Sequence, residues 1–370
     1  MRAVVVVPSE KKVQVLEHPE PELRAPSQVK VRILDVGVCG TDREIASFQY
    51  GTPPQGSDYL VIGHESLGEV VEVGAAVDGL AVGDLVVPTV RRPCPQGCPA
   101  CRVGRQDFCF TGDFTERGIG GAHGFMTELV VDEAAVLKRL DPALREVGVL
   151  VEPLTIAEKA FKQVWDVQDR LPWFDPNAAE TARGLDHKAV VFGAGPVGLL
   201  GAMALVLRGF ETWVYSLERP PHPKAAITEA IGAHYVSAAE HDMDALAEQV
   251  GRIDLVYEAT GAVRPTFALL ERLGQNGVFV LTGVPGHGKP SELDLHKLMR
   301  NMVLKNQLVL GTVNANAEAF AAAARDLAEF HRRWPAALAQ VISGRHALEA
   351  APALLEQGGD GIKQVVRIAD

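Results

Sequence analysis

The sequence lacks two features that would assign it to common classes of protein. No run of apolar residues approaches the ~20 needed to span a bilayer, although 47% of the 370 residues are hydrophobic. Positive charge is in deficit, with 36 Lys and Arg against 47 Asp and Glu, a formal net charge of −11. Because a nucleic-acid partner needs a basic face, we expect neither a membrane nor a nucleic acid as partner.

Cysteine is also scarce, but its five positions are not scattered. The first residues, Met1–Pro8, are typical of a short β-branched strand ended by proline rather than of a secretory signal, so we expect a reducing, cytoplasmic location. In that compartment clustered cysteines indicate metal ligands rather than disulfides. Four of them share one short segment: Cys94, Cys98, Cys101 and Cys109. Four thiolates fill the shell of a tetrahedral ion, so the segment predicts a structural zinc.

The fifth cysteine, Cys39, belongs to a different pattern. It is followed by Thr41 and, further on, by the pair His64 and Glu65. Cys and His suit zinc, and a shell that the protein fills only in part leaves room for water or substrate. We expect a catalytic zinc here. Glu65 or Glu152 could complete the shell, directly or through water, although Glu65 could instead orient the imidazole and Glu152 could cap a helix. The Thr41 hydroxyl is our candidate to accept the substrate proton.

The length of the chain favours two domains. Up to about residue 150, short strands such as Val29–Leu34, Ser66–Gly74 and Gly124–Val131 are separated by Gly and Pro, which predicts an antiparallel, barrel-like domain. A helix over about Pro153–Val167 follows, and residues 170–186 are polar and interrupted by proline, as in a surface segment. Beyond them, strands and helices alternate. This alternation predicts a doubly wound parallel sheet and hence an α/β protein.

A glycine-rich turn stands between an apolar strand and an apolar helix of this second region. It consists of Gly193, Ala194, Gly195, Pro196, Val197 and Gly198. In that context the pattern indicates a dinucleotide site, where the backbone approaches a pyrophosphate at a helix N-terminus. The next strand is followed by Ser216, Leu217, Glu218 and Arg219. A carboxylate there favours the ribose diol of NAD and an arginine favours the 2′-phosphate of NADP, so we expect both cofactors to be used.

In combination, these motifs resemble the zinc-dependent medium-chain dehydrogenases over essentially the whole chain. The segments that carry the resemblance are Gly37–Asp42, Gly63–Glu65, the four-cysteine segment, Glu152–Leu154 and Gly193–Gly198. Within that superfamily the chain is most similar to the archaeal-type glucose 1-dehydrogenases, through Thr89–Cys94, Gly104–Cys109 and Thr111–Ile119. The sequence departs from the family twice: three residues rather than two separate Cys94 from Cys98, and Ser216–Glu218 replaces a basic pair.

The resemblance implies a GroES-like antiparallel catalytic domain, residues 1–153 and 311–370, and a Rossmann dinucleotide-binding domain, residues 154–310. It implies contacts to sugar hydroxyls or neighbouring water for Thr41, Glu116, Glu152 and Asn314. It also places a set of residues near the nicotinamide half of the cofactor: Thr282, Gly283, Val284, Thr312, Val313, Asn314 and Lys363.

The function predicted from these observations is zinc-dependent, NAD- or NADP-linked oxidation of an aldose, with D-glucose giving its 1,5-lactone. A polyol, threonine or alcohol dehydrogenase of the same superfamily remains an alternative, because a hydrophobic pocket would favour simple alcohols and convergent polar groups favour a sugar. A cofactor-binding relative without activity is a second alternative, which the loss of Cys39, Thr41 or His64 would have favoured. We also expect a homo-oligomer, either a dimer or a tetramer.

Overall fold

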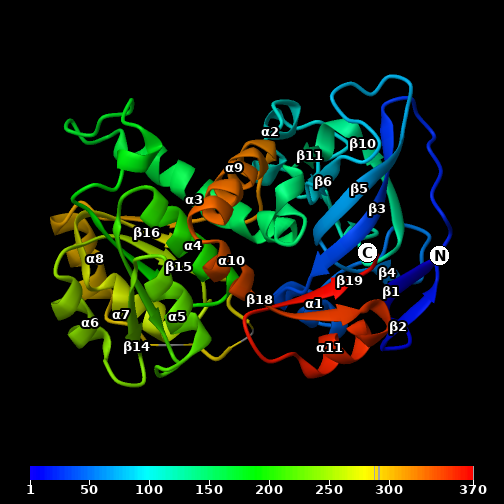
Figure 1. Ribbon diagram of the computed structural model, residues 1–370. Coiled ribbons are helices and arrows are strands. Elements are labelled where there is room, and N and C mark those ends of the chain that lie inside the picture. The colour runs from blue at the N-terminus through cyan, green and yellow to red at the C-terminus, as the bar shows by residue number, and fades with distance from the viewer. Residues whose placement is uncertain (287, 291, 370) are drawn as a thin grey trace. The chain divides into compact units, whose positions relative to one another are not determined.

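The structure is a computed structural model that describes residues 1–286, 288–290 and 292–369. The chain divides into two compact units (Figure 1). Unit 1 consists of Met1–Thr155, Asn314–Arg332 and Ile342–Asp370, and unit 2 of Ile156–Val313 and Arg333–Val341. The domain boundaries expected after residues 153 and 310 stay a prediction that limited proteolysis would test.

Unit 1 is built mainly from antiparallel sheets. Its strands are β1 (Arg2–Val7), β2 (Lys12–Glu17), β3 (Gln28–Gly37), β4 (Leu60–Val61), β5 (Glu65–Val73), β6 (Leu85–Pro88), β7 (Arg91–Arg92), β8 (Thr115–Arg117), β9 (Gly121–Ala122), β10 (Leu129–Glu133), β11 (Leu137–Arg139), β18 (Ile342–Ala347) and β19 (Lys363–Arg367). The principal sheet has the order β11-β6-β5-β3-β19-β18, with β10 also paired to β3. Smaller sheets have the orders β2-β1-β4 and β7-β8-β9.

The central strand of this sheet, β3, shows the alternation that its sequence predicts. Val29, Val31 and Ile33 are buried, whereas Arg32 between them is exposed. Two pairs depart from the expected antiparallel pattern, because β18 runs parallel to β19 and β8 runs parallel to β9. The antiparallel register pairs Gly37 of β3 with Glu65 of β5, which brings the end of one strand to the start of the other.

The strand expected over Gly124–Val131 is wrong in its first half. Strand β10 begins only at Leu129, and the residues before it form a buried irregular segment. The Phe125 N–H donates to the Gly63 carbonyl at 2.9 Å, and a Cβ on Gly124 would lie 2.4 Å from that same oxygen. This close approach to the turn before β5 replaces the regular ladder.

The helices of unit 1 are short, apart from two long helices whose residues are divided between unit 1 and unit 2 along the sequence. They are α1 (Gly40–Ala46), α2 (Pro99–Arg102), α11 (Ala351–Gln357), the first turn of α3 (Val151–Gln168) and most of α9 (Ala317–Arg333). Single turns of 3-10 helix occur in unit 1 at Gln106–Phe108, Ala134–Val136, Pro142–Leu144, Gly148–Leu150 and Leu348–Ala350, and in unit 2 at Glu180–Ala182.

Unit 2 is a doubly wound parallel sheet. Its strands are β12 (Lys188–Phe192), β13 (Glu211–Ser216), β14 (His234–Ser237), β15 (Ile253–Glu258), β16 (Leu273–Leu281) and β17 (Leu308–Gly311), in the order β14-β13-β12-β15-β16-β17. Its helices are the rest of α3, α4 (Pro196–Leu207), α5 (Pro223–Ala230), α6 (Met243–Val250), α7 (Val263–Leu270), α8 (Leu295–Leu304) and α10 (Pro335–Val341). The two-domain α/β fold class is confirmed.

The order of these strands locates the switch point of the sheet. The chain proceeds outward from β12 through β13 to β14, then returns to β15 on the other side of β12. Ligands of open α/β sheets bind outside the carboxyl ends of the strands at such a point. The glycine turn directly follows β12 and therefore lies at this edge. Among the described residues, no helix is both long and apolar enough to cross a membrane.

Candidate functional site

The four clustered cysteines converge in the structure. Their Sγ atoms all lie within 4.8 Å of one another, and none forms a disulfide. Backbone N–H groups point at these sulfurs: Cys94 donates to Cys101 and Cys98 donates to Cys94, each at 3.4 Å. The N–H groups of Phe110 and Cys101 lower the pKa of Cys98 to about 6. Because zinc binds thiolates, this cysteine lobe, residues 94–109, fits one ion in a closed four-sulfur shell.

A turn accommodates the extra residue between the first two cysteines. Gly97 has a φ of +59°, a conformation that costs glycine little, and its N–H donates to the Cys94 carbonyl at 3.1 Å. The additional residue therefore lengthens the turn without removing a ligand from the lobe.

A second group of possible metal ligands forms where the start of α1 meets the start of β5 in unit 1. Atoms of Cys39, His64 and Glu65 lie within 4.8 Å of one another. Cys39 caps α1, His64 precedes β5, and Glu65 is its first residue. Sulfur, nitrogen and oxygen donors in one place fit a zinc ion with three protein ligands and an open position. Thr41 lies half-buried in the first turn of α1, two residues beyond Cys39.

Asp42 connects two members of this metal group. Its fully buried carboxylate accepts a hydrogen bond from the Cys39 N–H at 2.8 Å, and its other oxygen lies 3.3 Å from Nδ1 of His64. Burial lowers the pKa of His64, but the Asp42 carboxylate outweighs burial and raises it well above the ordinary value. Asp42 thus turns Nε2 of the imidazole toward the metal group, the role of a carboxylate behind a ligating histidine.

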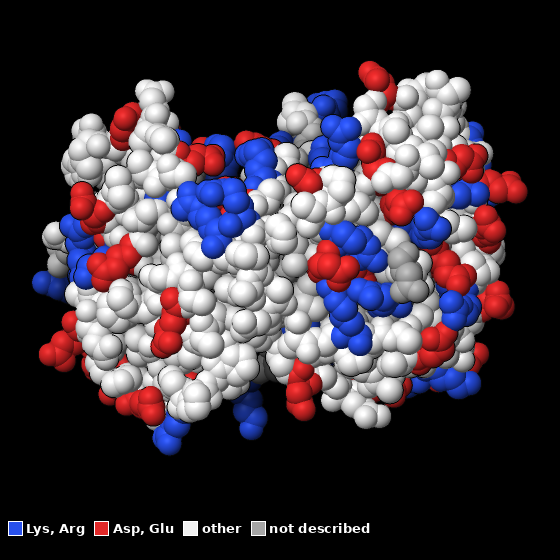
Figure 2. All heavy atoms as spheres, in the orientation of Figure 1, with Lys and Arg blue, Asp and Glu red and all other residues white. Residues whose placement is uncertain are grey.

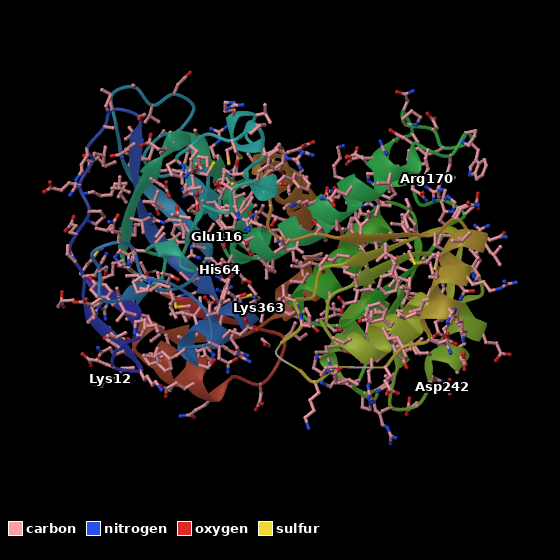
Figure 3. The ribbon with its side chains drawn as sticks, turned by 180° about the vertical axis from the view of Figure 1, so that it is seen from behind. Lys12, His64, Glu116, Arg170, Asp242 and Lys363 are labelled. Carbon is pink, nitrogen blue, oxygen red and sulfur yellow. The ribbon has the colours of Figure 1, made fainter. Side chains whose placement is uncertain are left out.

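Lys363 of strand β19 reaches the same group. Its Nζ donates to Glu65 Oε2 at 2.6 Å and to the Val38 carbonyl at 3.0 Å, and both charged side chains are almost completely buried. The Lys363 ammonium therefore neutralises the Glu65 carboxylate. The fit also requires Gly37, because a Cβ there would lie 2.2 Å from Glu65 Oε2. His64 and Lys363 are labelled in Figure 3.

Glu152 is buried at the start of α3, outside the compact group of three ligands. Its pKa is raised to about 7, chiefly by burial and in addition by the Glu65 and Asp42 carboxylates, against the opposing effect of His64 and Lys363. The structure thus brings the Glu65 carboxylate into the group and leaves Glu152 electrostatically coupled to it.

Two of the four polar residues expected to contact sugar, Glu116 and Asn314, meet within unit 1. Asn314 Nδ2 donates to Glu116 Oε1 at 2.9 Å, and Arg91 Nε donates to the same oxygen at 3.0 Å. The Arg91 guanidinium stacks 3.7 Å from the centroid of the Phe114 ring. A cavity of about 470 Å³ beside Glu116 is lined further by Tyr50 and Phe114. A charged acceptor between aromatic side chains is suited to a ring that carries hydroxyl groups.

The glycine turn of unit 2 has the geometry of a phosphate cradle. Gly193 has a φ of +107°, and a Cβ on Gly198 would lie 1.9 Å from the Gly193 carbonyl oxygen. Around Gly195, by contrast, a Cβ would meet no described atom within 4 Å. Local conformation and packing inside the protein explain why Gly193 and Gly198 are glycines, but they do not explain Gly195. The space at Gly195, which caps α4, together with the N–H groups of the first turn of the helix, which begin at Val197 because Pro196 has none, fits a pyrophosphate.

The residues after β13 hold a charge pair. Lys224 of α5 donates to one oxygen of Glu218, and Ser216 donates to the other at 2.7 Å. Burial alone would raise the pKa of Glu218, but these two donors lower it to about 2, so the carboxylate is ionised. Arg219 donates to the Ala239 carbonyl at 3.1 Å, and Leu217 is exposed.

The buried carboxylate of Glu258 accepts hydrogen bonds from both loops that follow β15 and β16. Glu258 accepts from the N–H groups of Thr260 at 2.6 Å and Gly261 at 2.7 Å, and its other oxygen accepts from Gly283 at 3.1 Å. Thr282 Oγ1 donates to the Glu258 carbonyl, whereas Val284 is exposed. The loops expected near the nicotinamide are therefore held together at the carboxyl edge.

Two more expected cofactor residues follow the edge strand β17. Thr312 Oγ1 accepts from Gln163 at 3.2 Å, and the Val313 carbonyl accepts from Lys159 at 2.8 Å, so both are tied to α3. Asn314 follows directly with a φ of 60°, a left-handed conformation that Asn tolerates better than most residues.

Sequence reasoning missed several residues that shape these sites, namely Asp42, Arg91, Lys224 and Glu258. Asp42 and Arg91 stand inside motifs that drew attention for other reasons. Three positions beyond Cys39, Asp42 occupies the place of a helix-capping carboxylate, and this spacing was a usable signal. Lys224 and Glu258 carry no such signal, because their roles depend on loops that meet only in the folded chain.

Comparisons with known proteins agree with this architecture. The family model described as Alcohol dehydrogenase GroES-like domain matches residues 25–141, and the model described as Glucose dehydrogenase C-terminus matches residues 145–368. The chain belongs to the glucose dehydrogenase family. This result confirms the resemblance to archaeal-type glucose 1-dehydrogenases within the medium-chain superfamily.

Individual members of the glucose dehydrogenase family align with this chain over most or all of its length. The "Glucose 1-dehydrogenase" of Methanocella arvoryzae is 37% identical, over 100% of this chain and 99% of its own. That of Thermoproteus tenax is 41% identical, over 89% of this chain and 88% of its own. The structure of Haloferax mediterranei glucose dehydrogenase in complex with NADP, Zn and gluconolactone superimposes with a TM-score of 0.87, at 32% identity and complete coverage of both chains.

Proposed function

We propose that this protein oxidises D-glucose to D-glucono-1,5-lactone, with NAD or NADP as hydride acceptor and zinc as metal cofactor. The reaction removes a proton from the C1 hydroxyl and a hydride from C1, so that the lactone carbonyl forms. The observation that carries the proposal is the occurrence, in unit 1, of a three-donor metal group and a separate cluster of convergent polar groups around Glu116. The family membership and the gluconolactone complex of the Haloferax protein support it.

Cys39, His64 and Glu65 would hold the catalytic zinc, and Glu152 would adjust its shell through water. A zinc ion bound there stabilises the alkoxide that develops on the sugar oxygen. Asp42 orients His64, and Lys363 keeps Glu65 in place and offsets its charge. The Thr41 hydroxyl would accept the proton from the sugar hydroxyl while it passes its own proton on, with the ribose hydroxyl of the cofactor as the next member of this relay. Cys39, His64 and Glu65 are positioned before substrate arrives, because Asp42 contacts Cys39 and His64 and the Lys363 ammonium holds Glu65.

The sugar is selected by hydrogen bonds. Glu116 and Asn314 are hydrogen-bonded to each other, and a hydroxyl group of the bound sugar would share these two partners. Thr41 and Glu152 would contact the part of the sugar that lies beside the metal group. Arg91 positions the Glu116 carboxylate by donating a hydrogen bond to its Oε1 atom. A simple alcohol lacks the further hydroxyl groups that could donate to the buried Oδ1 of Asn314, which has no partner among the described residues. A polar atom left unpaired in this way is a main basis on which polar sites reject analogues. The cysteine lobe would carry the structural zinc.

The cofactor would bind at the carboxyl edge of the sheet in unit 2. Its pyrophosphate would lie on the turn from Gly193 to Gly198, and its adenosine ribose beside Ser216–Arg219. Its nicotinamide half would contact the two loops Thr282–Val284 and Thr312–Asn314. The carboxylate of Glu218 favours NAD, and the ammonium of Lys224 beside it favours NADP, so the site accepts both cofactors with a moderate preference.

We also propose a homo-oligomer located in the cytoplasm. Helix α8 exposes Leu295, Met299 and Val303 at spacings of four residues, and each is at least 66% accessible. The neighbouring strand β17 ends the parallel sheet. An apolar helix face beside an open strand edge is suited to a two-fold contact with a second copy. On the face in Figure 2, basic and acidic side chains are interspersed, as expected of a protein without a nucleic-acid partner.

Steady-state kinetics with glucose, galactose, xylose, sorbitol, threonine and ethanol, each with NAD and with NADP, tests the proposed reaction. We expect the highest kcat/KM for glucose or a close aldose. Asn314→Ala should lower kcat/KM for glucose at least tenfold, because it removes a hydrogen-bond partner, and should affect ethanol little. Asn177→Ala, an exposed amide of unit 2, is the control. Equal turnover of ethanol and glucose, unchanged in Asn314→Ala, would exclude the sugar assignment.

A further inference from the structure

Unit 2 contains a cavity of about 480 Å³ at the amino edge of its sheet. Its floor lies where strands begin: Phe210 precedes β13, His187 precedes β12 and Arg252 precedes β15. The glycine turn follows the opposite end of β12, whose five residues extend about 17 Å at roughly 3.3 Å each. Cofactors of this fold bind at the carboxyl edge. The cavity is therefore separate from the dinucleotide site.

The other walls come from the end of α3 and from residues 171–185, the segment whose sequence predicts a surface excursion. This segment is anchored to the sheet. The Gly184 N–H donates to the Arg208 carbonyl at 2.8 Å, and a Cβ on Gly184 would lie 2.1 Å from the Phe210 ring. Arg183 donates in addition to the Pro176 carbonyl at 3.1 Å. The cavity thus has a defined cover, made by close backbone packing.

Aromatic side chains give the cavity flat walls. The rings of Trp165 and Phe210 stack with centroids 6.0 Å apart and planes 20° apart. The Arg183 guanidinium lies 5.6 Å from the Trp165 centroid and 5.9 Å from that of Phe174. Trp173 also lines the cavity, although most of its surface is exposed. Flat rings flanked by a planar cation favour a planar ligand, which stacks on both.

Two polar atoms of cavity-lining residues have no hydrogen-bond partner among the described residues. They are Nε of Arg183, a donor, and Oε1 of Gln168, an acceptor, and both atoms are buried. Buried polar groups are nearly always satisfied, so this pair indicates a missing partner. The lining has no excess of either charge: Asp254 lies 2.7 Å from Arg252 and 3.6 Å from His187, and Arg183 and Asp175 add one charge of each sign. A ligand that supplies one acceptor and one donor, without net charge on its ring, satisfies both atoms.

From this combination we infer that the cavity is a second binding site, which takes the neutral, planar heteroaromatic ring of a nucleoside. A volume of about 480 Å³ lies in the range of small-molecule sites. A nucleobase has the flat faces that the aromatic walls require, and its edge carries both the acceptor and the donor that Arg183 and Gln168 lack. This site goes beyond the proposed dehydrogenase reaction and does not depend on it.

Adenosine is the probe that tests this site. The full-length protein, with its dinucleotide site saturated by NADP, is titrated with adenosine in a calorimeter, and Trp fluorescence is followed in parallel because Trp165 and Trp173 line the cavity. We expect one equivalent of adenosine to bind and to change the fluorescence, while ribose alone gives neither signal. Binding that disappears once NADP is saturating would assign adenosine to the dinucleotide site and would overturn the inference.

Matched variants locate the binding. Arg183→Gln should weaken adenosine at least tenfold, and Gln168→Leu provides an independent test if Arg183→Gln lowers the melting temperature. Arg170→Gln is the control, because Arg170 (labelled in Figure 3) does not itself line the cavity. Its guanidinium donates to the carbonyls of Asn276, a lining residue, and Asn306, which is not one, and the substitution should change the affinity less than twofold. Failure of adenosine, inosine and cytidine to bind at millimolar concentration, or equal effects of Arg183→Gln and Arg170→Gln, would refute the inference.

Discussion

The charge pair after β13 leads to a quantitative prediction about cofactor preference. Glu218 is ionised, and its two oxygens accept from Lys224 and Ser216. Glu218→Gln keeps the shape of the side chain but removes its charge, and Lys224→Met keeps the length of the side chain but removes the ammonium. The two substitutions should therefore shift the preference between NAD and NADP in opposite directions.

The expected size of the shift in cofactor preference follows from the solvent exposure of Glu218 and Lys224. Two unit charges ~4 Å apart interact by about 1 kcal/mol in water and about 4 kcal/mol at an effective dielectric constant near 20. The Glu218 side chain is 28% exposed and that of Lys224 17%, and each offsets part of the other's charge, so the lower value applies. A change of about 1 kcal/mol corresponds to roughly a fivefold change in specificity.

The assay is the ratio of kcat/KM with NADP to kcat/KM with NAD at saturating glucose. Glu218→Gln should raise this ratio about fivefold, and Lys224→Met should lower it by a similar factor. Both effects should shrink in 0.5 M salt because the pair is partly exposed. Arg219→Gln, which removes a guanidinium bonded to the Ala239 carbonyl, should have a smaller effect. A ratio that changes less than twofold in both charge variants would refute the reasoning, and a wild type that uses only one cofactor would contradict dual use.

Three further predictions concern the metal sites and pH. Cys101→Ser should release zinc and lower the melting temperature, whereas a disulfide in the lobe of zinc-replete protein would contradict a structural metal site. Cys39→Ser should reduce kcat at least 100-fold, while the NADP affinity measured by fluorescence stays within twofold of the wild type. Burial lowers the pKa of His123 to about 4 in the folded protein. As the pH falls below 6.5, this histidine therefore binds a proton in the unfolded chain before it does so in the folded protein. The free energy of unfolding should consequently decrease between pH 6.5 and 4. His123→Asn should flatten that part of the curve of unfolding free energy against pH, and an unchanged slope would contradict the assignment.

Features encoded by short-range spacing could be predicted from the sequence. Four cysteines within sixteen positions, Cys94 to Cys109, converge in the structure, and the three glycines at Gly193, Gly195 and Gly198 form the turn that their context predicts. Short alternating strands such as β3, separated by Gly and Pro, predicted the antiparallel sheet, and the alternation of strands with helices from β12 onward predicted the parallel one. In each case the determining interactions lie within one turn, one strand or one loop.

Features that depend on approach between distant segments could not be predicted. Gly124 precedes a strand-like run, yet its contact with the Gly63 turn delays the start of β10. The choice between Glu65 and Glu152 was open because no local signal shows that Lys363 would bond to Glu65. Likewise, Glu218 and Arg219 gave opposite indications of cofactor preference, and only the packing of α5 shows that Lys224 is the partner of the carboxylate.

The bond between Glu65 and Lys363 has a consequence for the synthesis of the protein. The two residues are separated by 298 positions, so at 5–20 residues per second the ribosome adds Lys363 about 15–60 s after Glu65. During that interval the nascent chain already carries Cys39, His64 and Glu65, but lacks the cation that neutralises the carboxylate in the folded protein. Metal captured in that period would meet a more anionic and more open set of donors. The final electrostatic character of the metal group is therefore set by one of the last strands to be made.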